Sequence, residues 1–228
     1  MKRKTLSRNR LFAFCALAAL ATATHTHAAA VVTEHGPFGE GQGLTEAELN
    51  ALYPVGIGDV LELPTTTGSF ASGAGKYGGV LPTLTDGLAT PVPGSFYVEN
   101  GSQVEFQISP IDLARIDFFM YADWRRTSAW VDVETSTDGG ANWTLLHEVR
   151  QVEQNGGSHD REYNVHSLTD TTGTLASGIN AIRFTFLGDG MGDQESGYAE
   201  IDAYVVPEPA TFSLAALGLL LLGGRRRR

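Results

Sequence analysis

The chain has 228 residues, of which 42% are hydrophobic, 18% charged and 9% aromatic, with 27 glycines and a single cysteine. This composition fits a folded globular protein and excludes a collagen, a disulfide-rich miniprotein and a fully disordered chain. The apolar residues gather in two short runs, one near each end, which excludes a protein with several membrane spans. The middle is long enough for one domain with its own hydrophobic core.

Residues 1–30 have the three parts of a secretory signal peptide. Basic side chains crowd residues 2–10, an apolar run covers 11–21, and small residues end at Ala30. The apolar run is shorter than the roughly 20 residues of a membrane-spanning helix, which disfavours a permanent anchor. We expect signal peptidase to cleave after Ala30. Cleavage would also remove Cys15, so the mature chain would have neither disulfides nor thiol chemistry.

The other end of the chain also has three parts in order: a Pro-Glu-Pro motif, a mostly apolar stretch over 210–222, and a run of arginines (Pro207, Glu208, Pro209; Arg225, Arg226, Arg227, Arg228). As a helix the apolar stretch would reach about 20 Å, short of a ~30 Å hydrocarbon core. The arginines would keep the terminus on the cytoplasmic side of the membrane. A stretch that is held only briefly in a bilayer, beside an exposed rigid motif, suits a processing signal.

These three parts resemble the PEP-CTERM sorting signal, and the resemblance covers residues 207–228. It implies recognition and removal of the tail by an exosortase-type membrane protease in a Gram-negative bacterium that makes extracellular polysaccharide. The protein would cross the inner membrane, remain tethered for a time by a short transmembrane helix, and end at the cell surface or outside the cell. A tail that simply stays as an anchor is the alternative.

Removal of both ends changes the charge of the protein strongly. Between residues 31 and 206, seven Lys and Arg remain against 25 Asp and Glu, which gives a net charge of about −18. Such a chain is repelled by phosphate backbones, which excludes nucleic-acid binding. An acidic exported surface suits solubility, cation binding or contact with neutral glycans.

The region between the two end signals divides into a Gly-rich segment, 31–79, and a predicted β-sandwich domain, 80–206. In the first segment, capping-box spacing predicts a short helix over 45–54. A strand is predicted over 60–63, and the many Gly, Pro, Thr and Ser residues of 64–95 indicate long loops.

From Phe96 onward, apolar residues alternate with polar ones in short runs separated by turn residues. This period of two predicts half-buried strands, and no long amphipathic helix interrupts them. We therefore expect an all-β protein built as an antiparallel jelly-roll sandwich, followed by the hydrophobic C-terminal helix. The runs that carry the prediction cover 104–108, 114–120, 129–133, 143–152, 182–186 and 199–205.

One turn has a recognisable pattern. Ser136, Asp138, Gly140 and Trp143 match the Asp-box Ser-x-Asp-x-Gly-x-x-Trp, which resembles the repeated hairpins of sialidases. Glycines suit the positive φ of such a turn, and Asp138 can accept backbone N–H bonds within it. Sialidases carry several boxes and this chain carries one, so a structural hairpin is favoured over a catalytic role.

A second resemblance runs over residues 80–206. The motifs at 84–87, 114–117 and 198–204 together resemble the galactose-binding-like jelly roll of discoidin and carbohydrate-binding modules. The resemblance implies a structural Ca²⁺ held by Asp86 and Glu200 with backbone carbonyls. A solvated loop and an edge-strand glutamate are the alternative. The acidic loop over 189–195 could also wrap calcium, but an acidic hairpin connection is favoured.

The mature chain lacks the common catalytic motifs. It has no Gly-x-Ser-x-Gly elbow, no His-Glu-x-x-His helix, no phosphate-binding loop and no cysteine nucleophile. A secreted hydrolase would need a cleft that gathers His159, Asp160 and His166 with another acid. We therefore expect a non-catalytic protein.

A binding loop is predicted at Trp124, Arg125 and Arg126. An aromatic face can stack on a sugar, and guanidinium groups can donate to its hydroxyls or carboxylates. The alternative is that Trp124 packs over one end of the sandwich while the arginines neutralise nearby acids. The sequence as a whole predicts an exported, non-catalytic β-sandwich associated with extracellular polysaccharide. The alternative function is a calcium-assisted carbohydrate-binding module.

Overall fold

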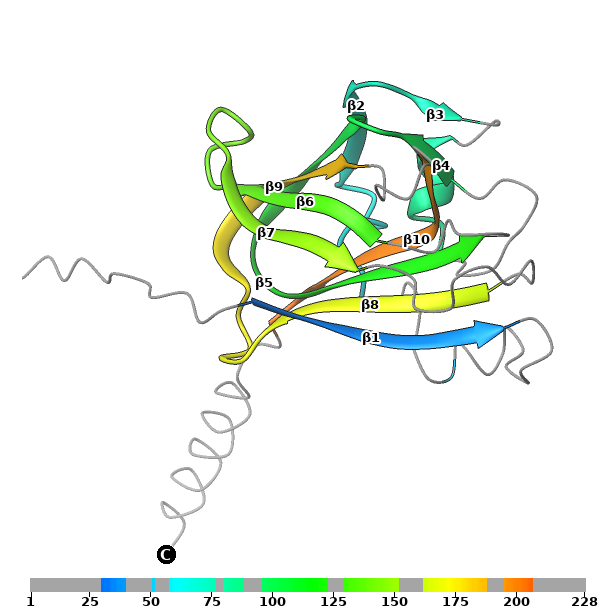
Figure 1. Ribbon diagram of the computed structural model, residues 1–228. Helices are drawn as coiled ribbons and strands as arrows, with labels where there is room; N and C mark the ends of the chain where they lie inside the picture. The colour runs from blue at the N-terminus through cyan, green and yellow to red at the C-terminus, as the bar shows by residue number, and fades with distance from the viewer. Residues whose placement is uncertain are drawn as a thin grey trace, which may run out of the picture.

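The computed structural model describes residues 30–39, 51, 58–76, 80–87, 96–122, 129–151, 162–187 and 195–206. These residues form an antiparallel β-sandwich (Figure 1), which confirms the predicted all-β jelly-roll class. The strands are β1 (Ala30–Gly39), β2 (Thr67–Ser72), β3 (Gly75–Lys76), β4 (Phe96–Glu99), β5 (Gln103–Ala122), β6 (Ala129–Ser136), β7 (Thr144–Gln151), β8 (Glu162–Asp170), β9 (Ala176–Phe186) and β10 (Glu195–Val205), with a 3₁₀ helix η1 (Leu81–Leu84).

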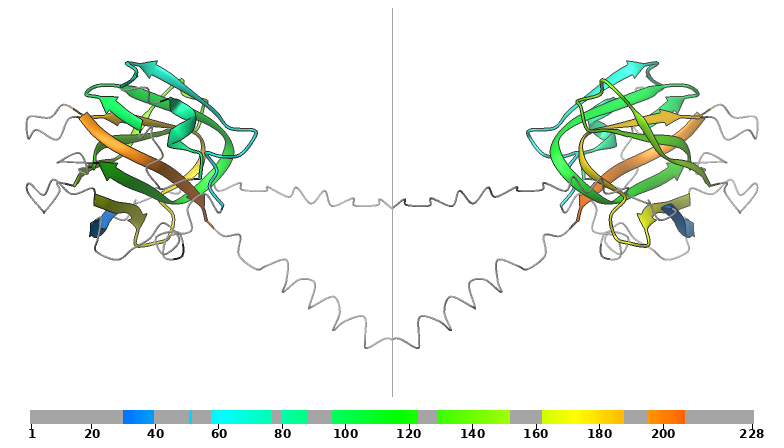
Figure 2. Two further views of the ribbon diagram at one scale, coloured as in Figure 1. Left: turned by 90° about the vertical axis from the view of Figure 1, so that its right-hand side faces the viewer. Right: turned by 90° about the vertical axis from the view of Figure 1, so that its left-hand side faces the viewer.

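The long strand β5 belongs to both layers of the sandwich. Its first half pairs with β2 and β9, and β9 continues through β6 to β7. Its second half pairs with β8 and β10, which extend the other layer to β1 on one side and to β4 and β3 on the other. Side views place β2 and β3 (cyan) at one edge and β1 (blue) at the other (Figure 2).

A break in the ladder allows β5 to change layers. The two predicted runs 104–108 and 114–120 form this one strand, and its pairing with β9 shifts between Gln107, Ile111 and Leu113. Pro110, which is exposed, lies inside the shift. A proline cannot donate to the ladder, so it is tolerated in a strand at an irregularity of this kind.

The Gly-rich segment supplies strands to the same sandwich. β1 pairs with β8, β2 with β5 and β3 with β4. The prediction of loops throughout 64–95 is therefore wrong at β2 and β3. A strand at the edge of a sheet is held by backbone hydrogen bonds to its neighbour and does not require alternating apolar side chains, so the sequence carries no period of two there. The strand predicted over 60–63 is also wrong: only Asp59 forms a bridge, to Tyr204, and bends and turns follow it.

Aromatic rings fill the centre of the core. Phe184 makes edge-to-face contacts with Phe106 and Phe118, at centroid distances of 6.1 and 5.9 Å, and Phe186 packs on Tyr198 at 4.9 Å. All five rings are at most 2% exposed. Aromatic pairs at these distances and angles add to the free energy that burial alone provides.

No helix in the described part of the chain is long and apolar enough to cross a membrane. The predicted hydrophobic helix over 210–222 lies outside that part, as do the signal-peptide residues 1–29 and, apart from Ala51, the predicted helix over 45–54.

Candidate cation site

Three carboxylates meet beside β10. Asp59, Glu62 and Glu200 each place one oxygen within 4.8 Å of the others. Asp59 is 2% exposed and Glu200 is fully buried, whereas Glu62 is exposed. Two oxygens that bind one Ca²⁺ at about 2.4 Å lie at most about 4.8 Å apart, so this spacing is compatible with a shared ion. We call these three residues the carboxylate cluster.

Asp59 ties its segment to β10. Its Oδ1 accepts the Leu61 N–H at 3.0 Å and the Ala203 N–H at 2.6 Å, and the Val60 N–H donates to the Ala203 carbonyl. Its other oxygen, Oδ2, is buried and has no hydrogen-bond partner among the residues that the structure describes. A buried carboxylate oxygen without a partner costs free energy, so its presence here points to an ion or a proton that occupies the cluster.

Glu200 joins β10 to the turn after η1. Its Oε2 accepts the Asp86 N–H at 3.1 Å, and the Gly87 N–H also bonds this carboxylate. Its Oε1 is buried, and none of the described residues gives it a hydrogen bond. Glu200 therefore has one oxygen bonded to the turn and one that the described residues leave without a hydrogen bond.

Electrostatic repulsion adds to the cost of burying these acids. Burial raises the pKa of Asp59 to about 7, and the nearby Asp202 and Glu62 add to the shift. Burial and Asp202 also raise the pKa of Glu200 strongly. Burial, Asp202 and Asp86 raise the pKa of Glu62. A bound divalent cation would reverse these shifts, because it favours the ionised carboxylates.

None of the arginine side chains that the structure describes forms an ion pair with the carboxylate cluster. The arginines of the sandwich pair with other acids: Arg115 with Asp117, Arg150 with Asp132 and Glu148, and Arg183 with Glu134 and Glu105. The described arginines therefore do not neutralise the negative charge of the cluster.

The structure brings one predicted calcium ligand, Glu200, into the cluster and leaves the other at its border. Asp86 contacts Glu200 through its backbone N–H, and its exposed carboxylate is a nearby negative charge that raises the pKa of Glu62. Sequence reasoning missed Asp59 and Glu62. The signal available was two acids three residues apart, just before a Pro-Thr-rich turn.

Other predicted site residues do not gather into a site in the described structure. Trp124, Arg125 and Arg126 lie outside the described residues, as do His159, Asp160, the acidic loop over 189–194, and the sorting residues from Pro207 onward. His166 is fully buried in β8 between β1 and β5. It therefore does not line an open cleft.

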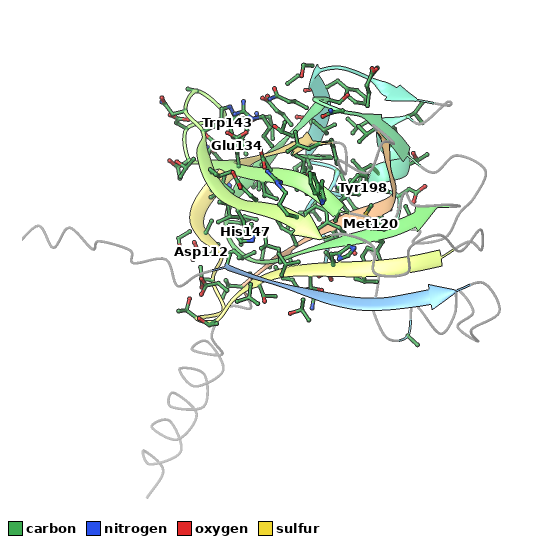
Figure 3. All side chains as sticks on the ribbon, in the orientation of Figure 1. Asp112, Met120, Glu134, Trp143, His147 and Tyr198 are labelled. Atoms are coloured by element: carbon green, nitrogen blue, oxygen red, sulfur yellow. The ribbon has the colours of Figure 1, made fainter. Side chains whose placement is uncertain are left out.

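The Asp-box forms a rigid hairpin turn between β6 and β7. Asp138 Oδ1 accepts the Ser136 hydroxyl at 2.7 Å and the Asn142 N–H at 2.9 Å, as predicted for a structural turn. The Arg183 guanidinium lies over the Trp143 ring at 4.4 Å and also pairs with Glu134. Figure 3 shows Trp143 beside Glu134 at the hairpin end. These contacts support a structural role for the box.

Comparisons with known proteins give one sequence match and several matches of shape. No curated protein matches this sequence significantly. CpGH89CBM32-5 from Clostridium perfringens, in complex with GalNAc-β-1,3-galactose, is similar with 12% identity and a TM-score of 0.45 over 62% of this chain and 96% of that one. The family 32 carbohydrate-binding module from Streptococcus pneumoniae EndoD is similar with 14% identity and a TM-score of 0.46, over 64% of this chain and 99% of that module. The family 32 module of C. perfringens NanJ, in complex with galactose, has 12% identity and a TM-score of 0.44, over 61% and 93%.

These likenesses of shape do not assign a ligand to this chain. The sequence match concerns the end of the chain, where residues 205–228 fit the PEP-CTERM protein-sorting motif. The motif begins at the last residue of β10, so it follows the sandwich directly. The chain therefore ends in a PEP-CTERM sorting motif, which implies export, transient anchoring in the membrane of a Gram-negative bacterium and processing by an exosortase.

Proposed function

We propose that this chain is the precursor of a non-catalytic extracellular protein whose β-sandwich binds Ca²⁺ at the carboxylate cluster and works among extracellular polysaccharide. The sorting motif supports export, and removal of the tail from Pro207 onward would leave β10 intact. The mature charge of about −18 supports a role in which cations are bound.

The observation that carries the calcium assignment is a pair of buried oxygens, Asp59 Oδ2 and Glu200 Oε1, that belong to the carboxylate cluster and have no hydrogen-bond partner in the described part of the chain. Oxygen ligands suit a hard cation, and Ca²⁺ accepts irregular sets of carboxylate and carbonyl oxygens. An ion bound there would join the segment at 59–62, the turn at 86–87 and β10. Its function would be to fasten two surface segments to the sandwich.

Thermal unfolding of the exported protein tests this function. Free Ca²⁺ at about a hundredfold excess over the dissociation constant stabilises the folded state by about 2.7 kcal/mol. For a domain of this size that energy raises the melting temperature by about 5–10 °C. Glu200→Gln should lose the response, since Gln keeps a carbonyl oxygen for the Asp86 N–H but has no charge.

Glu148→Gln is the matched control, because its carboxylate is exposed on β7. It should respond to Ca²⁺ as the parent protein does. An equal melting temperature with Ca²⁺ and with a chelator in the parent protein would refute the calcium assignment.

Glycan binding is the second candidate function, favoured by Trp124, Arg125 and Arg126. This segment connects β5 to β6, and connecting loops of a sandwich are common places for ligand sites. Glycan-array binding that disappears in Trp124→Ala would support this function. Unchanged binding in that variant would remove the loop from consideration.

A further inference from the structure

The start of β1 and the end of β10 lie at the same end of the sandwich. Val31, the residue after the expected signal-peptide cut, is paired with Thr169 of β8, and Thr169 is paired with Arg115 of β5. Arg115 is paired in turn with Tyr204, near the end of β10. Three steps between neighbouring strands, at about 4.8 Å each, place Val31 about 14 Å from Tyr204. Figure 1 shows the start of β1 (blue) and the end of β10 (orange) at this end of the sandwich.

The chain is fastened to the sandwich up to the residue before the Pro-Glu-Pro motif. Val205 is paired with Leu113 of β5, and the Val206 N–H donates to the Asp112 carbonyl at 2.8 Å. The Asp112 carboxylate in turn accepts the Gly178 N–H at 2.8 Å, which joins this point to β9. The sorting tail therefore starts from a fixed point on the sandwich.

The length of the interval between the sandwich and the apolar stretch limits how far the sandwich can stand from a membrane. Three residues, 207–209, separate Val206 from the apolar stretch that begins at Ala210. A fully extended chain spans at most about 3.3–3.6 Å per residue, so Val206 lies within about 14 Å of Ala210. The lipid headgroups occupy about 5–7 Å on each side of a bilayer. A sandwich anchored by this stretch therefore sits with this end on or just above the headgroups.

The exposed side chains at this end suit contact with a membrane surface. Five exposed residues, which we call the junction face, gather at the start of β1, the turn after β8, the start of β9 and the end of β10: Val31, Thr171, Thr172, Ser177 and Val205. Val31 is 45% and Val205 40% exposed, so the face offers two apolar contacts. The other three side chains have hydroxyl groups, which can donate to phosphate oxygens. None of the five side chains is charged, so anionic lipids repel this face only weakly.

We propose that the junction face lies against the phospholipid headgroups of the membrane in which the sorting tail anchors the protein, held there by the short interval over 207–209. The inference rests on the proposed export and anchoring, and it is independent of the calcium assignment. Cleavage after Ala30 would add the positive α-amino group of Val31 to the face, and this charge attracts phosphate. Removal of the tail would release the face from the membrane.

Fluorescence quenching on vesicles tests this orientation. The full chain is expressed in a host that exports it and has no exosortase, so that the tail stays. It is then reconstituted into vesicles of phosphatidylethanolamine and phosphatidylglycerol, with a nitroxide on some of the headgroups. Cys15 is the single cysteine of the chain, so a Cys15→Ser background gives each variant one thiol to label. The label on Ser177→Cys should lose about half or more of its fluorescence, because it would lie at the headgroups.

Asn100→Cys is the matched control at the opposite end of the sandwich. Asn100 is exposed in the turn before β5, where the Gly101 N–H donates to the Phe186 carbonyl at the end of β9. Ser177 and Phe186 are nine positions apart on β9, which corresponds to about 30 Å, so the label on Asn100→Cys should lose little fluorescence. Thr171→Cys is a second position on the junction face and should be quenched as Ser177→Cys is.

A longer tether tests the cause of the orientation. A flexible Gly/Ser linker of about 20 residues between Val206 and Pro207 has a root-mean-square length of about 25 Å, so it should lower the quenching at Ser177 toward that at Asn100. Flotation of the full chain with the vesicles tests the anchoring separately, and failure to float would refute the anchoring and this inference with it. Flotation with equal quenching at Ser177 and Asn100, or quenching at Ser177 that the linker leaves unchanged, would overturn this inference alone.

Discussion

Asp59→Asn should change the dependence of stability on pH. Burial and its acidic neighbours raise the pKa of the Asp59 carboxyl from 3.8 to about 7. Between these two values the folded protein keeps the proton that the unfolded chain has lost. The contribution of Asp59 to the free energy of unfolding is therefore fully present below pH 3.8, and it is lost as the pH rises through about 7.

The size of the loss follows from the two pKa values. Their difference of roughly three units corresponds to about 4 kcal/mol, at 1.36 kcal/mol per unit. Asparagine keeps an oxygen for the Leu61 and Ala203 N–H groups and has no charge. In a chelator, Asp59→Asn should therefore unfold like the parent at about pH 4 and be up to about 4 kcal/mol more stable above about pH 8.

At high pH, Ca²⁺ should make the parent protein more stable than Asp59→Asn, which is the opposite of the order expected in a chelator. The ion neutralises the parent cluster, whereas the variant has lost a ligand, so the parent becomes the more stable protein. Urea unfolding followed by tryptophan fluorescence, across pH and with or without Ca²⁺, measures both effects. Parallel pH profiles for parent and variant in chelator would refute the reasoning.

Four further substitutions test the packing of the sandwich and the turn. Phe184→Ala should cost about 3–5 kcal/mol in the free energy of unfolding, because it removes a fully buried ring from its contacts with Phe106 and Phe118; Phe184→Leu should cost clearly less, and equal losses would contradict the packing argument. Gly140→Ala should destabilise by about 1–3 kcal/mol, because its φ is +87° and a Cβ would lie 3.0 Å from Trp143 Cζ2. Gly173→Ala, at φ +84° with nothing within 4 Å, should cost less in the same urea titration, and a larger loss there would count against the steric part of the argument.

Alternation predicted the strands that have one face in the core. In β6, Val131 and Val133 are buried while Asp132 and Glu134 are partly exposed, and this contrast is visible in the sequence. In β8, Val165, His166, Ser167 and Leu168 are all buried, so no contrast between faces exists to be read. Strand β8 was accordingly not predicted.

Of the three residues in the carboxylate cluster, only Glu200 was predicted from the sequence, and the cause is the distance between the three along the chain. Glu200 was found because the motif over 198–204 resembles a known family pattern, whereas Asp59 and Glu62 precede it by more than a hundred residues. Their proximity depends on the bridge from Asp59 to Tyr204. A single isolated bridge leaves no periodic signal, so only the folded chain reveals which acids meet.

The mass of the accumulated protein, measured together with the cell fraction that contains it, tests the central claim most directly. The account predicts a chain that begins at Val31, lacks the four terminal arginines and is found outside the cytoplasm. Recovery of the intact chain of 228 residues from the cytoplasm as the stable form would contradict export and removal of the tail.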